Sequence, residues 1–408
     1  MLATIFLTVF IDLLGVGIII PVLAPLFLNP MSGILPVDYQ SAILTRQLLL
    51  GLLISVYPLA QFFGAPILGA MSDRFGRKKI LIVSLIGTCI GYLFFGAGIA
   101  AASLATLFMS RAIDGFTGGN ISIALSAIAD ISDPKEKARN FGLIGMAFGL
   151  GFILGPYIGG KLADPTVVSW FTHSTPFWFA AALTFLNIML VAFRFPETLK
   201  TRVQTRISAF TGFRNIAKAF RMPNLRTMFL VVFFLTIGFN FFTQFFQVYL
   251  IEKFQFTTGN IGDLFAYIGL WIAFGQGVVT RIASKKFKPH QILSVSCVML
   301  SAALLALLIP DKSWMLLIVL PFVAIANGLT QPNSTAMISN LSSKEAQGEV
   351  LGINQSIQSL GMAIPPIIAG IISTIDRILP IFMASCFVFL AWVIFLAFYS
   401  NRKQEVFQ

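Results

Sequence analysis

Charged, metal-binding and disulfide-forming side chains are scarce in this chain of 408 residues. Only 11% of the residues are charged, whereas 57% are hydrophobic. A soluble protein of this size lacks the polar surface to cover so many apolar residues, so a soluble fold is excluded. The chain has two histidines, and its three cysteines (Cys89, Cys297 and Cys386) all fall within apolar runs. We therefore expect no zinc site, no disulfide framework and, without a nucleophile–base set, no enzyme.

Long apolar runs are what the sequence has in abundance. A membrane-spanning helix needs about 20 mostly apolar residues, and polar breaks divide the chain into twelve such stretches. The first is too long for a cleaved signal peptide and lacks a small-residue cleavage site. We therefore predict an all-α membrane protein with twelve transmembrane helices. They are expected near residues 2–28, 46–70, 80–100, 103–131, 141–163, 176–195, 225–251, 259–283, 290–309, 315–341, 349–374 and 380–400.

The net charge of +12 is explained by membrane topology rather than by binding to nucleic acid. When the segments between spans are assigned alternately to the two sides, 22 of the 28 Lys and Arg fall on the side that carries both termini. Such an excess is typical of cytoplasmic loops. We therefore expect both termini in the cytoplasm, the chain in the inner (plasma) membrane and no nucleic-acid partner. The six exceptions are Arg46, Arg111, Lys161, Lys253, Lys312 and Arg377.

The two halves of the chain repeat each other. A shift of 210 residues places Gly142 on Gly352, Gly151 on Gly361, Pro156 on Pro366 and Gly160 on Gly370. Internal repeats of this kind are typical of secondary transporters that bind substrate near the middle of the membrane. We predict two pseudo-symmetric six-helix bundles over residues 1–195 and 225–400, a cytoplasmic linker over 196–224 and a cytoplasmic tail over 401–408. The amphipathic part of the linker either lies on the membrane surface or is a mere tether.

Asp12 is the most informative single residue. It stands about ten residues into the first span, which places it roughly 15 Å deep. Arg111 and Asp114 should reach a similar depth in the fourth span. They stand three residues apart on one helix face and can partly neutralise each other, so they form either a structural pair or part of the proton-coupling site. A charge at the membrane centre costs about 2.5–3.5 kcal/mol, so these three residues must face one another or a wet cavity. Asp12 then either exchanges a proton between the two sides, which we favour, or forms a structural pair with Arg111.

Two glycine-containing strings accompany these charges. The first, GAPILGAMSDRFGRKK from Gly64 to Lys79, is expected to turn at Gly69 and joins the second span to the third. The second, GFILGPYIGG from Gly151 to Gly160, lies in the fifth span. Small residues four apart let helices approach closely, and a proline removes one backbone hydrogen bond and bends the helix.

These strings resemble those of drug:proton antiporters related to the tetracycline exporters, within the major facilitator superfamily. Asp12-x2-Gly15-x-Gly17 and Arg111-x3-Gly115-x2-Gly118 share the resemblance, which covers most of the first half and thins in the second. It implies the major facilitator fold, with Asp12, Arg111 and Asp114 coupling protons to transport. It also implies an inner gate and conformational switch, formed by Gly69, Asp73, Arg74, Gly76, Arg77, Asp130, Arg139, Gly151, Gly155, Pro156 and Gly159.

Uncharged amides and aromatic rings dominate the expected substrate lining. They suit a small amphiphilic organic compound, drug-like or a metabolite, although any one amide can instead join two helices by a hydrogen bond. Tetracycline exporters of this kind carry a histidine in the eighth span, where Trp271 stands here, so tetracycline itself is not the expected substrate. The predicted lining comprises Tyr57, Gln61, Asn240, Gln244, Gln247, Trp271, Asn327, Gln331, Asn354 and Gln358.

The sequence therefore predicts a monomeric, proton-coupled exporter that works by alternating access. Its expected partners are protons, the organic substrate and the lipid bilayer, and the proton gradient replaces any cofactor. One alternative is a symporter that imports a nutrient, which the fifth-span string disfavours. The other is a non-transporting membrane receptor, which would need a larger extramembrane domain than this sequence contains.

Overall fold

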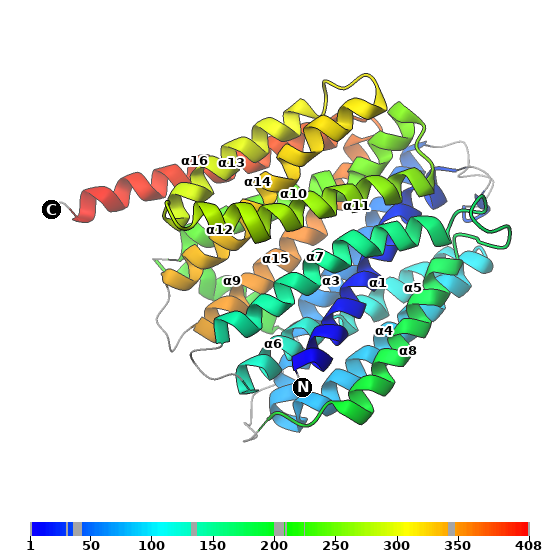
Figure 1. The fold of residues 1–408 in the computed structure, drawn as a ribbon, viewed down its shortest axis with the longest axis horizontal. Helices are drawn as coiled ribbons and strands as arrows, with labels where there is room; N and C mark the ends of the chain where they lie inside the picture. Colours follow the sequence, from blue (N-terminus) through cyan, green and yellow to red (C-terminus); the bar gives the residue numbers. More distant parts are fainter. Residues whose placement is uncertain are drawn as a thin grey trace. The chain divides into compact units, whose positions relative to one another are not determined.

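A computed structural model describes residues 2–29, 32–35, 43–131, 137–199, 208, 210–223, 225–341 and 347–406, without the side chains at 43, 129, 137–145, 148, 347–349, 351 and 398–406. Every regular element in this part of the chain is a helix (Figure 1), which confirms the all-α prediction. The first elements are α1 (Leu2–Leu28), α3 (Ile43–Phe75), α4 (Arg77–Ala100), α5 (Leu104–Thr117), α6 (Asn120–Ile131), α7 (Lys137–Leu162), α8 (Thr175–Arg194) and α9 (Thr211–Arg221). The later ones are α10 (Arg226–Phe254), α11 (Thr258–Phe274), η2 (Gly275–Val279), α12 (Thr280–Ala283), α13 (Pro289–Ala306), η3 (Ser313–Met315), α14 (Leu316–Asn340), α15 (Gln347–Ile372) and α16 (Leu379–Val406).

Ten helical stretches, counted over the described residues, are long and apolar enough to cross a membrane. They match ten of the twelve predicted spans, and α1 has the predicted limits. The fifth predicted span is the 26-residue helix α7. The fourth is divided between α5 and α6, whose 14 and 12 residues are each shorter than a single membrane crossing.

The chain divides into two compact units. Unit 1 comprises Met1–Thr211 and Phe256–Gly269, and unit 2 comprises Gly212–Gln255 and Leu270–Gln408. The first part of α11 therefore belongs to unit 1, where Asp263 pairs with Lys161 of α7 at 2.9 Å. Asp263 is exposed, as a surface charge would be. The predicted boundaries of the two bundles stay a prediction.

In unit 1 the helix α1 packs along α7 and α8 (Figure 1). Its close approach to α7 depends on glycine. A Cβ on Gly155 would lie 2.7 Å from the Gly17 Cα, and a Cβ on Gly17 would lie 3.0 Å from the Pro156 Cδ. Gly151 and Gly159 face the backbone of α1 in the same way. The string in the fifth span therefore packs against the first span.

Replacing Gly155 with alanine is expected to destabilise the protein by about 1–3 kcal/mol, since the added methyl group meets backbone atoms that cannot turn aside. Gly352→Ala is the matched control, because a Cβ at Gly352 meets no atom within 4 Å. Thermal unfolding of the purified variants measures the difference. An equal melting temperature for the two variants would contradict this account of the α1–α7 contact.

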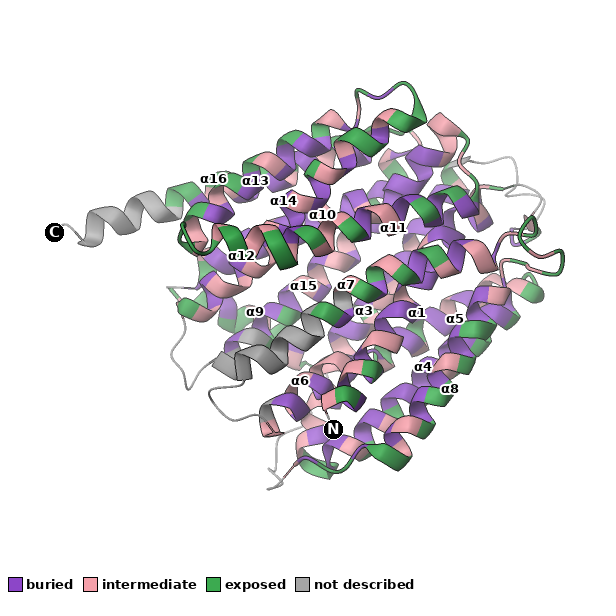
Figure 2. Cartoon of the chain, in the orientation of Figure 1, coloured by how far each residue is buried: buried purple, intermediate pink, exposed green. Residues whose placement is uncertain are grey.

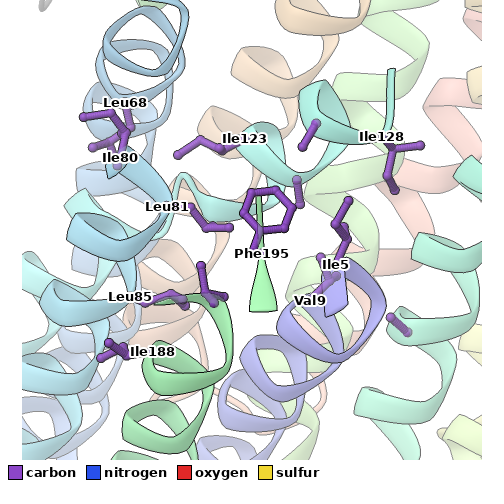
Figure 3. Close-up of a cluster of buried hydrophobic side chains, with 14 of the residues drawn as sticks. Ile5, Val9, Leu68, Ile80, Leu81, Leu85, Ile123, Ile128, Ile188 and Phe195 are labelled. Carbon is purple, nitrogen blue, oxygen red and sulfur yellow. The ribbon is translucent and has the colours of Figure 1, made fainter. Parts of the chain in front are cut away.

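Buried apolar side chains of α1, α3, α4, α6 and α8 form one cluster inside unit 1 (Figure 3). Phe195, which directly follows α8, lies in its middle. Around it are Ile5 of α1, Leu81 of α4 and Ile123 of α6 (Figure 3). This cluster holds α6 by its apolar face, because moving α6 away would expose the cluster to water or leave voids.

The fourth predicted span is interrupted at Gly118 and Gly119. The Gly118 N–H bonds the Gly115 carbonyl at 3.2 Å, and the Gly118 carbonyl accepts from Gln61 Nε2 at 2.9 Å. A Cβ on Gly118 would lie 2.7 Å from the Tyr57 hydroxyl. Helix α3 thus occupies the space that the glycine leaves and also satisfies the freed carbonyl, which is how broken helices are tolerated inside a membrane.

Two further local expectations differ from the structure. The turn expected at Gly69 is absent, because α3 continues to Phe75 and the chain turns at Gly76 instead. The amphipathic stretch of the predicted linker forms α9, whose Asn215 side chain donates to Ser356 Oγ of α15 at 3.0 Å. This segment is therefore docked on unit 2, whereas a mere tether would lack such a contact.

In unit 2, α10 packs along α15 and α16, and α13 packs along α14 and α16. The predicted eighth span contains the π-helical turn η2 between α11 and α12. A Cβ on Gly275 of this turn would lie 3.0 Å from the Ile325 Cα, so α14 passes close to its backbone. The widened turn also frees the Gly275 carbonyl, which accepts a hydrogen bond from the Thr280 hydroxyl at 2.9 Å.

Residues coloured as exposed lie along α8 and other helices in Figure 2, and many exposed residues are large and apolar. On α8 they include Trp178, Phe185, Leu186 and Phe193. A soluble monomer rarely exposes so many neighbouring apolar residues. Together with the ten apolar helices, this exposure indicates that lipid surrounds the outer faces.

Candidate functional site

Asp12 lies on α1 and is only 6% exposed. Its Oδ1 accepts a hydrogen bond of 2.5 Å from Nδ2 of Asn120, the first residue of α6. A second bond sets the orientation of this amide, because Asn120 Oδ1 accepts from the Ile121 N–H at 2.8 Å. The Asp12 carboxyl group therefore points into unit 1, toward the break between α5 and α6, rather than into lipid.

Arg111 pairs with Asp114 of its own helix. Arg111 Nη1 lies 3.2 Å from Asp114 Oδ2, and both side chains are buried. The guanidinium also lies over the Tyr57 ring, with Cζ 4.5 Å from the ring centroid. No ion pair joins Asp12 to Arg111 among the described residues, so the alternative of a structural pair between them is wrong. The carboxylate three residues along the same helix face binds the guanidinium instead.

The buried polar atoms without a hydrogen-bond partner in the described part of the chain include the Tyr92 hydroxyl and Arg111 Nε. The Tyr92 hydroxyl lies against Gly15, three residues after Asp12. With both carboxylates ionised, the buried residues Asp12, Asp114 and Arg111 carry one net negative charge. A buried group with this imbalance can take up one proton and become neutral.

Arg77, near the start of α4, is the centre of a second polar network. Its Nη1 contacts Asp73 at 2.5 Å and Ser72 Oγ at 2.6 Å, and its Nε contacts Asp130 of α6 at 3.1 Å. Arg77 itself is buried, so these contacts are shielded from solvent on its side. This geometry brings together three of the residues predicted for the inner gate.

Other predicted gate residues lie apart from this network. Arg74 is exposed, and its guanidinium lies 5.3 Å from the centroid of the Phe75 ring. A Cβ on Gly69 would meet no atom within 4 Å. The side chain of Arg139 lies outside the described residues. Gly151, Gly155, Pro156 and Gly159 all pack on α1, as described above.

Glu197 is a member of the second network that sequence reasoning missed. One carboxylate oxygen accepts from the backbone N–H groups of Arg77 (2.9 Å), Thr198 (3.0 Å) and Leu199 (3.0 Å), and the other from that of Lys78 (3.3 Å). It thereby satisfies free N–H groups at the start of α4, where an anion is favourable. The acidic residue two positions after the sixth apolar span was the only local signal.

Gly76 makes room for this carboxylate. Its φ of 106° is a conformation that other residues rarely adopt. A Cβ at this position would also overlap a carboxylate oxygen of Glu197. The glycine in the loop is therefore required twice, once for the turn and once for the contact with Glu197.

The predicted substrate-lining residues fall into two groups. Tyr57 and Gln61 belong to the polar region of unit 1, where they contact Arg111 and Gly118. In unit 2, Asn240 and Gln247 of α10 donate to carbonyls of their own helix, those of Thr236 (2.9 Å) and Gln244 (3.2 Å). Neither of these two bonds joins two helices.

Several amide oxygens in unit 2 are buried without a hydrogen-bond partner in the described part of the chain. They belong to Gln247 of α10, Asn327 of α14 and Asn354 of α15. Gln244, Gln331 and Gln358 are half-buried, and so is Trp271, whose ring meets Phe274 edge to face at 5.7 Å. Such unsatisfied oxygens remain available to a hydrogen-bond donor, because each unpaired buried acceptor costs free energy.

Comparisons with known proteins place this fold and these residues in a family. The family model of the Major Facilitator Superfamily matches residues 5–320 and 298–408. The class C tetracycline resistance protein of Escherichia coli is 29% identical over 393 residues, covering 96% of this chain and 92% of that protein. Multidrug resistance protein 2 of Bacillus subtilis (strain 168) is 27% identical, covering 97% and 94%.

A likeness in structure agrees with these matches. The crystal structure of the human organic anion transporter MFSD10 (TETRAN) superposes with a TM-score of 0.75 at 22% identity, covering 97% of this chain and 98% of that one. The fold is thus that of a multi-pass membrane transporter. The chain belongs to the major facilitator superfamily, as its sequence motifs predicted.

Proposed function

We propose that this transporter exports a small amphiphilic organic compound in exchange for protons. The observation that carries the proposal is the buried Asp12 carboxyl group, bonded to Asn120 in a unit that also buries the Arg111–Asp114 pair. The proposal is supported by the names of the relatives, one a tetracycline resistance protein and the other a multidrug resistance protein.

The proposed cycle is alternating access with Asp12 as the proton carrier. Substrate enters from the cytoplasm while Asp12 is ionised. Protonation of Asp12 from outside favours release, and loss of the proton to the cytoplasm resets the protein. Arg111 and Asp114 support the coupling, because their charges keep the region one proton short of neutrality. The contacts of Arg77 with Asp73 and Asp130 form as the inner end closes behind the bound substrate, and they break after protonation of Asp12, when the protein returns to the inward-facing state.

The predicted substrate-lining side chains are uncharged, and this property indicates the chemistry of the substrate. The amide oxygens of Gln247, Asn327 and Asn354 have no hydrogen-bond partner among the described residues, and α10, which carries Gln247, is rich in phenylalanine. Hydrogen-bond acceptors among apolar groups suit a compound with a few donors on a lipophilic frame. A sugar phosphate or a compact inorganic ion would need charged partners that this set lacks. We propose that the protein works as a monomer in the inner membrane, with cytoplasmic termini and no cofactor.

The direction of flux under an imposed pH gradient tests the function. Purified protein is placed in lipid vesicles with an acidic lumen, and uptake of a fluorescent quaternary lipophilic cation is followed. A permanently charged probe is needed, because a weak base would collect in acidic vesicles without any protein. Antiport predicts uptake against an acidic lumen that exceeds uptake into protein-free vesicles. Uptake driven by acid outside would indicate a symporter instead, and pH-independent binding without uptake would indicate a receptor.

A further inference from the structure

Helix α6 joins the two polar networks of unit 1. Asn120, its first residue, donates to Asp12 at 2.5 Å. Asp130, near its other end, accepts from Arg77 Nε at 3.1 Å and from the Thr198 hydroxyl at 3.3 Å. Ten residues of helix separate the two contacts, which corresponds to roughly 15 Å along the axis. One short helix therefore carries both the hydrogen-bond partner of buried Asp12 and the ion-pair partner of buried Arg77.

The construction of α6 lets it move as one body. Gly118 and Gly119 interrupt the helix between α5 and α6, and Gln61 binds the Gly118 carbonyl. Along its length, Ile123, Ala124, Ala127 and Ile128 are buried in the apolar cluster around Phe195 (Figure 3). Because the span is interrupted at Gly118 and Gly119 and apolar contacts are non-directional, α6 can shift slightly without unwinding.

The protonation state of Asp12 changes how strongly it holds this helix. A hydrogen bond to a carboxylate is about twice as strong as one between neutral groups. The partial positive charge at the start of α6 also favours the ionised form. Protonation therefore weakens the attachment of Asn120 without abolishing it.

From this geometry we infer that α6 transmits the protonation state of Asp12 to the Arg77–Asp130 ion pair, with Asn120 as the positioning residue that couples them. The inference rests on the proposed function, because it explains how a proton bound to α1 loosens the contacts at the start of α4. When Asp12 is ionised, Asn120 holds α6 in the position in which Asp130 binds Arg77. When Asp12 is protonated, α6 is released and the ion pair weakens.

Asp12 is the group that changes charge in this account, and its surroundings have to be considered with it. Arg194, the described charged residue of α8, is its exposed last residue, and Lys161 of α7 pairs with Asp263. Both lie at helix ends, whereas Asp12 is near the middle of α1. The titratable and charged groups around Asp12 are Asp114 and Arg111 of α5, Tyr57 of α3 and Tyr92 of α4.

Hydrogen exchange at the start of α4 tests the inference. The N–H groups of Arg77 and Lys78 are bound by Glu197 in the network that contains the ion pair. Their exchange is measured at an acidic and a mildly alkaline pH and corrected for the intrinsic pH dependence of exchange. In the natural protein, acidification is expected to raise the corrected exchange about tenfold, the effect of weakening one charge-assisted hydrogen bond.

Two variants at Asn120 remove the coupling in different ways. Asn120→Ala removes the whole amide. Asn120→Leu keeps the approximate size of the side chain and adds no titrating group. It lacks the N–H group that binds Asp12, so it remains informative if the alanine variant fails to fold. In both variants we expect the response of Arg77 and Lys78 to acidification to disappear.

Asn187 provides the matched control. It is a buried amide on α8 whose Nδ2 donates to the Thr8 carbonyl at 3.3 Å, one turn before Asp12 on α1. Asn187→Ala removes a similar contact to the same helix and should leave the response to acidification in place. An unchanged response in both Asn120 variants would overturn the inference, and so would an equal loss in Asn187→Ala.

Failure of the inference can be told apart from failure of the proposed function. Proton-driven uptake in vesicles combined with no acid response at Arg77 would leave the function standing and overturn the role of α6. An acid response that Asn120→Ala abolishes, without any proton-driven uptake, would support the link through α6 and overturn the proposed export. Persistence of the response in Asp12→Asn would show that another group is sensed, which also overturns the inference.

Discussion

Replacing Asp12 with asparagine is expected to abolish proton-driven accumulation of substrate. An amide neither binds nor releases a proton at physiological pH, so flux is no longer tied to the proton gradient. For exchange of one proton per substrate, a gradient of one pH unit supports about a tenfold concentration ratio. A potential of 100 mV adds about 2.3 kcal/mol, or roughly fifty-fold, only for an uncharged substrate, whose exchange moves one net charge. In the variant, the ratio that the pH gradient supports should fall to one.

The structure makes this substitution a clean test. The asparagine oxygen can still accept the hydrogen bond from Asn120, so the fold should persist, and unfolding in detergent verifies it. Asp263→Asn is the control, since it removes a carboxylate that is exposed and paired with Lys161. The measurement is uptake of the quaternary cation into vesicles with an acidic lumen. Wild-type accumulation by Asp12→Asn would remove the central support for the proposed mechanism.

Replacing Arg77 with methionine is expected to have the second largest effect. Methionine retains much of the apolar stem but loses the contacts with Asp73, Asp130 and Ser72. Removing one partner of a fully buried ion pair costs about 3–5 kcal/mol. Since Asp73 and Asp130 are partly exposed, we expect about 1–3 kcal/mol here. A change of one to two kcal/mol in a two-state equilibrium alters the ratio of the states by roughly 5–30-fold.

Both stability and transport should therefore respond to Arg77→Met. We expect a lower melting temperature. We also expect a transport rate that falls in proportion to the population of the state in which the inner end is closed. Lys79→Ala serves as the control, because it removes an exposed positive charge from the same first turn of α4. Arg77→Lys is informative as well, since a lysine cannot present several donors in a fixed plane. If Lys79→Ala slowed transport as much as Arg77→Met, loop charge rather than the Arg77 contacts would be responsible.

The membrane spans could be predicted closely because their signal is local. The apolar run from residue 2 to residue 28 is helix α1 itself, and nine further apolar stretches are helices of sufficient length. Inside a bilayer the backbone must satisfy its own hydrogen bonds, so a long apolar run has little choice but to form a helix. The glycine and proline string of the fifth span also indicated a close helix contact from the sequence alone, and in the structure it packs on α1.

The partner of Asp12 could not be predicted in the same way. The cost of a charge in the membrane required that Asp12 face the protein, and it does. The three-residue spacing indicated the contact of Arg111 with Asp114, which is present in the structure. That Asp12 is bound by Asn120 rather than by Arg111 depends on the break at Gly118 and on the position of α3, which no local pattern reports.

Glu197 shows the same limit at the other network. Two of its four bonds to backbone N–H groups, those to Arg77 and Lys78, join residues about 120 positions apart in the chain. Nothing near an isolated Pro-Glu-Thr segment reveals that the start of α4 lies beside it. Only the packing of Phe195 in the apolar cluster brings this segment to that place.

The sequence by itself determined that this chain is a helical membrane protein of two similar halves, with an acid placed deep in its first span. The length of the apolar runs and the distribution of positive charge between the loops can be compared directly with what a bilayer requires, and the internal repeat is visible in the sequence itself. The tertiary structure alone decided that Asp12 is held by Asn120, and that α6 also carries Asp130 to Arg77. Those contacts arise where helices meet at glycine, because the distance between two helices depends on side chains from both of them.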